Sequence, residues 1–167
     1  MQSKLLVSAA TVAIALLGAG CGSTSPSAAV ASASPSAAAS PAPSVPTTPA
    51  TIKVATDAKL GKILVDGNGL TVYLFVVDTG TASTCYTSCA KIWPPVLTAG
   101  APQAGAGAQA SLLGTTARTD GTTEVTYAGH PLYYFIQDKK AGDTTGQGVN
   151  GFGGLWWVLT PSGAAMH

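Results

Sequence analysis

The sequence predicts a single small, mainly β domain that is built from two similar β-hairpin units, has at most one short helix and follows a disordered tether. Runs of β-branched and aromatic residues flank the turn sequence Asp66-Gly67-Asn68-Gly69, as in a β-hairpin. A similar arrangement returns around Ala128-Gly129. Only 9% of the residues are charged, and none lies between Lys4 and Lys53, so the N-terminal part lacks the composition of a folded domain.

Residues 1–20 have the features of a lipoprotein signal peptide. Lys4 gives a positive start, and the apolar run from Leu5 to Leu17 is shorter than the ~20 residues that a membrane span needs. The sequence Leu17-Gly18-Ala19-Gly20-Cys21 resembles the bacterial lipobox, which directs lipid attachment to Cys21 and cleavage before it. It departs from the usual pattern at Gly18, where Leu is common. The alternative is an ordinary secretory signal, with Cys21 as an unmodified thiol.

Residues 21–50 are predicted to form a disordered tether. Gly22 to Ala50 consists almost entirely of Ala, Ser, Pro, Thr and Gly, so it has no large side chains whose burial would offset the entropy of ordering. Its prolines favour polyproline II, in which about 3.1 Å per residue gives a reach on the order of 90 Å. The tether therefore holds the predicted domain, residues 51–165, away from the membrane.

About seven strands are expected in the domain, and they follow its apolar and β-branched runs. The segment that favours a helix is Cys85 to Ile92. Because a unit of about 55 residues buries too little surface to be stable alone, the two units are expected to share one core. The predicted strands are Thr51–Val54, 62–65, 70–75, Leu112–Arg118, 122–127, 132–135 and Leu155–Thr160.

The two units, about 51–100 and 112–163, share the pattern Tyr-x-aromatic-x-x-Asp, and a tryptophan segment follows each copy. Each aspartate is expected to cap a turn by accepting backbone N–H groups. The alternative is that pseudo-symmetry brings the two carboxylates together as one polar site, although calcium needs six to eight oxygen ligands. The motif residues, as candidate structural or ligand groups, are Tyr73, Phe75, Asp78, Tyr133, Phe135 and Asp138.

These features together resemble a family of predicted bacterial lipoproteins that carry a secreted repeat of unknown function. The resemblance rests on the doubled motif, on Trp93-Pro94-Pro95 after a cysteine pair and on the lipobox, and it covers about Ile52 to Gly163. It implies secretion and membrane attachment, and it implies no established activity. Some relatives look linked to hydrocarbon (alkane) metabolism.

The three cysteines are consistent with export and lipidation. If Cys21 carries the lipid, Cys85 and Cys89 remain as a pair in an oxidising compartment, and a disulfide is expected. One helical turn brings their Cα atoms to about 6 Å, which a disulfide can span. The alternative is a redox pair or a soft-metal site, although the spacing is not the C-x-x-C of thioredoxin-like sites.

Other candidate sites have a plainer interpretation. Gly146 to Gly151 matches the dinucleotide pattern G-x-G-x-x-G, but it leads into an expected strand instead of a helix, so it is interpreted as a glycine loop. His130 and His167 are far apart in the sequence and make a poor metal site. Trp156 and Trp157 are adjacent on a strand and must face opposite ways, so one of them is expected on the outer face.

Three function hypotheses follow, and the favoured one is a non-enzymatic envelope lipoprotein that binds a protein, a glycan or a small apolar ligand. It places the chain on the extracytoplasmic face of the cell membrane. We expect no enzyme and no cofactor, because no base–nucleophile constellation is recognisable. Without Lys4 the chain has equal numbers of acidic and basic side chains, which argues against nucleic acid. The alternatives are a redox or metal-handling protein that uses Cys85 and Cys89, and an accessory role in hydrocarbon metabolism.

Overall fold

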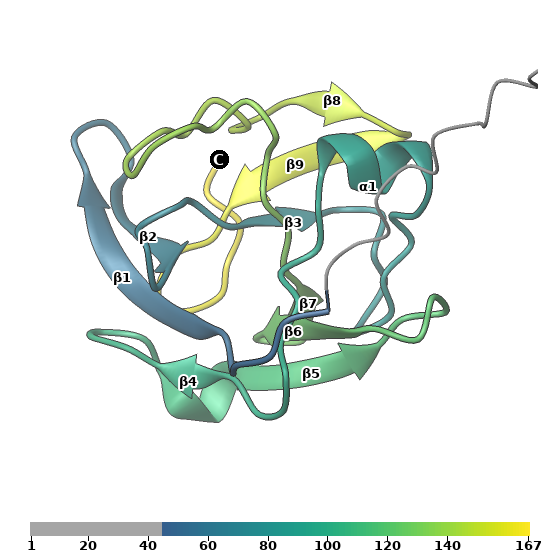
Figure 1. Cartoon of the computed structure of the whole chain (residues 1–167). Coiled ribbons are helices and arrows are strands. Elements are labelled where there is room, and N and C mark those ends of the chain that lie inside the picture. Colours follow the sequence, from purple (N-terminus) through teal and green to yellow (C-terminus); the bar gives the residue numbers. More distant parts are fainter. Residues whose placement is uncertain (1–44) are drawn as a thin grey trace, which may run out of the picture. The chain divides into compact units, whose positions relative to one another are not determined.

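The computed structural model describes residues 45–167 and confirms the mainly β fold class (Figure 1). The described part contains nine short strands, one α-helix and one 3-10 turn. The predicted signal peptide, Cys21 and all of the tether before Val45 lie outside the described residues. Among the described residues, no helix is long and apolar enough to span a membrane.

The elements follow the predicted runs closely in the first copy and less closely in the second. The helix α1 (Ser88–Ile92) is shorter than predicted, and the strands β4 and β8 were not predicted because they are two-residue pairings in glycine-rich or polar loops. The strands are β1 (Thr51–Asp57), β2 (Gly61–Asp66), β3 (Tyr73–Phe75), β4 (Gln103–Ala104), β5 (Leu113–Ala117), β6 (Thr123–Tyr127), β7 (His130–Pro131), β8 (Asn150–Gly151) and β9 (Gly154–Val158).

Three small sheets make up the domain, each with three strands. β1 pairs antiparallel with β2 and parallel with β4, so the first sheet has the order β2-β1-β4. The second has the order β3-β9-β8 and joins strands far apart in the sequence, while β5, β6 and β7 form an antiparallel meander. The second predicted hairpin is present as β6 and β7. The first is reduced to a short pairing in which Val65 bridges Thr71, because β2 pairs along its length with β1 and β3 pairs with β9.

The two repeats exchange their motif strands, which we define as residues 73–76 and 133–136. The first motif strand pairs with β9 of the second repeat, with Leu74 opposite Trp157. The second motif strand pairs with residues 92–95 of the first repeat, where the Tyr134 N–H donates to the Pro94 carbonyl at 2.8 Å. Each motif strand is thus hydrogen-bonded to a segment of the other repeat.

The exchange has an approximate two-fold symmetry about Tyr73 and Tyr133. The backbone N–H of each tyrosine donates to the carbonyl of the other, at 2.8 and 2.9 Å. Farther out, Val76 N–H donates to Leu155 O at 3.1 Å, and the equivalent Ile136 N–H donates to Ile92 O at 2.9 Å. Residues 92–97 therefore correspond to residues 155–160, with a constant offset.

Two hydrophobic clusters fill the interior, and both contain side chains from the two repeats. The first includes Tyr73 and Trp93 from one repeat and Tyr133 and Trp156 from the other. The second gathers aliphatic side chains such as Leu64 with side chains of β6 and its neighbours. The expectation of a shared core is met, because neither repeat encloses a cluster made only of its own residues.

We predict that neither repeat folds alone. Fragments 45–107 and 108–167 each lack the partner of their motif strand, so each should give a disordered far-ultraviolet circular dichroism spectrum and a collapsed amide proton dispersion by NMR. Mixing the two fragments should restore the dispersed spectrum of the uncut domain. A dispersed spectrum from either fragment at a concentration where it is monomeric would contradict the exchange.

Candidate functional site

The motif tyrosines and aspartates bind each other across the two repeats. The Tyr73 hydroxyl donates to the Asp138 carboxylate at 2.5 Å, and the Tyr133 hydroxyl donates to the Asp78 carboxylate at the same distance. Burial raises the pKa of both tyrosines well above its usual range, and the neighbouring carboxylates add to the shift. Both phenols therefore stay protonated and act as hydrogen-bond donors.

The second oxygen of each aspartate holds the loop that follows the motif. Asp78 accepts hydrogen bonds from the backbone N–H and the hydroxyl of Thr84, at 2.8 and 2.6 Å. Asp138 accepts the same pair of bonds from Thr145, at 3.0 and 2.5 Å. This agrees with the expectation that the carboxylates bind backbone N–H groups. Each aspartate is joined to the other repeat's tyrosine and to its own loop, so both have a structural explanation.

The motif phenylalanines and the tryptophans form a continuous stack of four rings. Trp93 and Trp156 stack at the centre, with centroids 4.0 Å apart and planes 3° from parallel. Phe75 stacks on Trp156 at 4.0 Å, and Phe135 stacks on Trp93 at 4.2 Å, so each phenylalanine packs on the tryptophan of the other repeat. The motif is thus an interlock between repeats, and its side chains are turned inward.

A buried ion pair breaks the two-fold symmetry. The Arg118 guanidinium donates to the Glu124 carboxylate at 2.6 Å, and both side chains are almost fully buried. Arg118 also donates to the Ser83 hydroxyl and the Cys85 carbonyl, and it lies 4.3 Å from the centroid of the Tyr86 ring. The ion pair therefore connects β6 to the loop that carries the cysteine pair.

Within this network, Glu124 is a buried carboxyl group whose pKa is shifted from its ordinary value. Burial raises the pKa of its carboxyl to about 7, with Arg118 opposing the rise and Asp78 adding to it. The carboxylate atom Oε1 is buried and has no hydrogen-bond partner among residues 45–167. Since an unpartnered buried oxygen is costly, Glu124 is less favourable when ionised than an exposed glutamate.

The cysteine pair forms a disulfide between Cys85 and Cys89, whose Cα atoms are 5.2 Å apart. Both cysteines are buried in the first hydrophobic cluster, and the bond encloses the N-terminus of α1. Thr87, inside this loop, has a φ of 49°, which a β-branched residue rarely adopts. The disulfide loop is therefore a stapled turn packed on the core.

The remaining residues that the sequence suggested as site candidates do not come together into a common site. His130 lies in β7, and the ring of His167 packs edge-to-face with that of Trp157, with ring centroids 4.7 Å apart. Groups of three metal-ligating side chains are absent from the described part of the chain. Trp156 is fully buried, and Trp157 is partly buried against the second hydrophobic cluster, so neither stands fully exposed. The glycine pattern 146–151 leads into the β8–β9 hairpin, as the sequence indicated.

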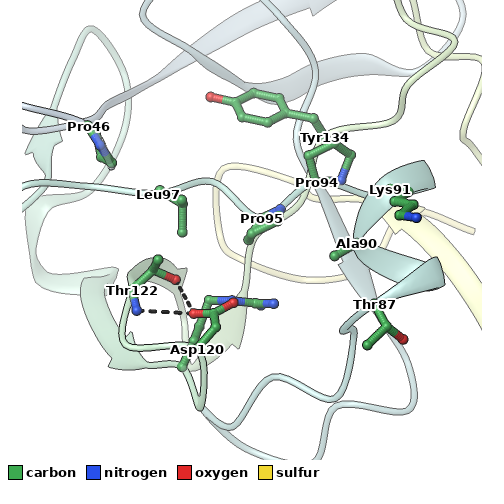
Figure 2. Close-up of a pocket in the computed structure, with 11 residues that line it drawn as sticks. Pro46, Thr87, Ala90, Lys91, Pro94, Pro95, Leu97, Asp120, Thr122 and Tyr134 are labelled. Atoms are coloured by element: carbon green, nitrogen blue, oxygen red, sulfur yellow. Dashed lines mark hydrogen bonds and ion pairs between the residues drawn. The ribbon is translucent and has the colours of Figure 1, made fainter. Parts of the chain in front are cut away.

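A cavity of about 600 Å³ lies between α1 of the first repeat and the turn after β5 of the second repeat (Figure 2). Pro94, Pro95 and Leu97 form its floor, and the partly exposed ring of Tyr134 lies at one side. A second cavity of about 390 Å³ adjoins it and shares Leu97 and Tyr134. The other lining residues are Pro46, Thr87, Ala90, Lys91, Arg118, Asp120 and Thr122.

The walls of this cavity combine an apolar floor with polar margins. Asp120 accepts hydrogen bonds from the backbone N–H and hydroxyl of Thr122, at 3.1 and 2.5 Å. Burial alone would raise the pKa of the Asp120 carboxyl, but the bonds from Thr122 and Arg118 lower it below the usual value. Lys91 on α1 supplies an opposite charge at the margin. The cavity suits an apolar ligand that also carries polar backbone or hydroxyl groups.

Sequence reasoning missed this cavity and the Arg118–Glu124 pair. The cavity is formed by segments that are remote in sequence, and its floor consists of prolines and Leu97, which carry no chemical signature. Glu124 had a weak signal, because it interrupts the apolar β-branched run of β6 at a position equivalent to Ile63. A charge at a position where the first repeat has a core residue can indicate a buried ion pair.

Comparison with known proteins gave one match. A lipoprotein family model described as a secreted repeat of unknown function matches residues 54–97 and 114–160. These two ranges agree with the two repeats that the structure interlocks, and they contain both copies of the motif. No curated protein and no solved structure matches the chain.

We predict that the two tyrosine–aspartate bonds differ in strength. Asp78 is buried, while Asp138 is partly exposed and can exchange its lost bond for water. Tyr133→Phe should lower the free energy of unfolding by about 1.5–3 kcal/mol, the range for a bond to a charged group, and Tyr73→Phe should lower it by less. Tyr127→Phe, which removes hydrogen bonds to the Pro161 carbonyl and from the Gln109 N–H, is the control for the loss of bonds to uncharged groups. Urea denaturation measures all three, and equal losses for the two motif tyrosines would contradict this account.

We also predict that Glu124 makes stability depend on pH. The carboxyl has a pKa of about 7 in the folded state, against an ordinary value of 4.5 for glutamate. The unfolded chain therefore releases this proton at lower pH than the folded chain, so stability falls as the pH rises between these values. From pH 4 to pH 8, the free energy of unfolding of Glu124→Gln should rise relative to that of the native protein by up to roughly 3 kcal/mol. Urea titrations at these pH values measure it, and a constant difference would refute the shift.

Proposed function

Because this chain belongs to the lipoprotein family described as a secreted repeat of unknown function, we propose that it is a non-enzymatic binding protein of the cell envelope. In this proposal Cys21 carries the lipid, and the chain between Cys21 and Val45 holds the domain away from the extracytoplasmic face of the membrane, since Thr48 and Ala50 already hydrogen-bond to the domain. The family description supports export from the cytoplasm. The lipobox resemblance at Cys21 supports the lipid anchor.

The observation that carries the binding role is the cavity between α1 and the turn after β5, together with the fact that the motif residues are already bound to each other. Both motif aspartates and both motif tyrosines are bound to each other and to their loops. The cavity, in contrast, has an apolar floor and a partly exposed tyrosine. Its size falls within the range of small-molecule and cofactor sites, about 300–1,000 Å³.

The ligand classes that fit are a segment of an envelope protein, a glycan or a small apolar molecule. Tyr134 offers a ring face for a sugar or an apolar chain, and its hydroxyl is held by the Asp66 carboxylate at 3.2 Å. Burial raises the pKa of Tyr134 above its usual range, so the phenol stays neutral. A neutral, fixed aromatic ring favours an uncharged ligand surface at this side of the cavity.

The cavity predicts where a ligand is detected. Titration of the ¹⁵N-labelled domain with a peptide, a cell-wall glycan fragment and a short alkyl chain should move the amide signals of the lining residues for one class. Ala90→Trp should fill the cavity and abolish these shifts, while Lys139→Trp, at an exposed position outside the lining, should leave them unchanged. Both variants should unfold at nearly the native temperature. Equal shifts in Ala90→Trp would place the ligand elsewhere and refute the proposed site.

The lipid anchor has its own test. Mass spectrometry of the envelope protein should find a mature N-terminus at Cys21 with an acyl modification, and Cys21→Ser should move the protein from the membrane fraction to the soluble fraction. Recovery of Cys21→Ser in the membrane at the native level would contradict the anchor without affecting the cavity.

A further inference from the structure

The backbone beside the cavity has an unpaired edge, defined here by the outward-facing groups of Pro95 and Leu97. The groups on either side of Leu97 are bonded inward, because Val96 O accepts from Val125 N–H at 2.8 Å and Thr98 N–H donates to Thr123 O at 3.0 Å. Backbone groups alternate in direction along an extended chain, so the N–H and carbonyl of Leu97 and the carbonyl of Pro95 face the other way. None of these three groups has a hydrogen-bond partner among residues 45–167.

The second repeat has the same edge, and there the chain covers it with its own C-terminal segment. By the two-fold correspondence, Pro95 and Leu97 match Val158 and Thr160. Thr160 N–H donates to Ala164 O at 2.9 Å, and Val158 O accepts from Met166 N–H at 2.9 Å. These bonds form an antiparallel pairing in which Leu159 is opposite Ala165. The C-terminus lies beside β9 in Figure 1 as a result.

The side chains of this covering segment show what the edge accepts. Ala165 packs against the second hydrophobic cluster, and Met166 packs against the first. The segment is extended, it has small and apolar side chains, and it has an N–H where Val158 O needs a donor. In the first repeat the equivalent space is the 600 Å³ cavity, and both Pro95 and Leu97 line it.

We infer that the first repeat binds an extended peptide segment of a partner protein by adding it as a strand to the Pro95–Leu97 edge. The peptide runs antiparallel to this edge. One carbonyl of the peptide accepts from Leu97 N–H, and the N–H two residues later donates to Pro95 O, as Ala164 and Met166 do in the second repeat. An apolar peptide side chain enters the cavity. This inference rests on the proposed binding function and names its ligand class.

Pro95 restricts the edge to a short segment. Pro95 has no N–H, so the edge offers a peptide one bond fewer than an ordinary edge strand. This device lets the edge bind one short extended segment and resist open-ended pairing with other chains. The charged residues that line the cavity are Lys91, Arg118 and Asp120, and its floor is apolar.

The test uses an acetylated peptide with the sequence of residues 162–167, which copies the covering segment of the second repeat. It is titrated into the soluble chain 22–167 labelled with ¹⁵N. The Leu97 amide signal should shift downfield and become protected from exchange with solvent. A matched peptide with an N-methyl group on the residue equivalent to Met166 should bind about tenfold more weakly or worse, because it cannot donate to Pro95 O.

Protein variants provide an independent test of strand addition. Leu97→Pro removes the N–H and should abolish binding, while Leu97→Ala keeps the N–H and should retain most of it. The melting temperature of each variant shows that it is folded. If Leu97→Pro does not fold, the comparison of the two peptides on the native chain decides the question alone.

The outcomes separate this inference from the proposed function. Shifts at the lining residues without protection of Leu97, or equal binding of the N-methylated peptide, would overturn strand addition and leave the cavity as a binding site. Binding to a chain that starts at Val45 but not to chain 22–167 would overturn a partner as the occupant, since residues before Val45 would then cover the edge. No binding to either chain at millimolar peptide would overturn the inference, while the alkyl and glycan titrations test the cavity separately.

Discussion

Two backbone hydrogen bonds between Tyr73 and Tyr133 join the repeats at their pseudo-two-fold axis, and the arrangement of the domain depends on this junction. Once these strands are side by side, each motif strand reaches the tryptophan segment of the other repeat, and the four aromatic rings can stack. Each motif aspartate then lies within hydrogen-bond distance of the tyrosine hydroxyl of the other repeat. A pattern of three residues, used twice, therefore holds a small domain together without a large core of its own in either repeat.

The two repeats differ at the outer edge that follows each tryptophan, and this difference leaves one repeat closed and the other with the candidate binding site. The second repeat closes its outer edge with the C-terminal segment, while the equivalent edge of the first repeat borders an open cavity, close to its disulfide-stapled helix and to the buried ion pair that the second repeat supplies. A duplicated unit can keep one copy closed, since the interlock supplies stability to both. The other copy is then free to keep an unpaired edge, which would be a liability in a longer strand.

The sequence allowed the repeat, the fold class and the disulfide partners to be predicted, because each has a local signature: a repeated motif, alternating β-branched residues and an isolated cysteine pair. The exchange of strands was not predictable, since the same spacing fits a repeat that folds on itself. The free groups of Leu97 were equally hidden, because they depend on what lies beside them in space. Glu124 was interpreted as part of a strand, and only the packing of Arg118 against it shows that the strand carries a buried charge.

Native-state hydrogen exchange of the full domain tests the interlock most directly. The amide protons of Tyr73 and Tyr133 bond to each other's carbonyls, so both should exchange only on global unfolding, with the same free energy and the same dependence on denaturant. If the Tyr73 amide exchanged at a distinctly lower free energy than the Tyr133 amide, one repeat would open while the other stayed folded, and the account of a single interlocked unit would be wrong.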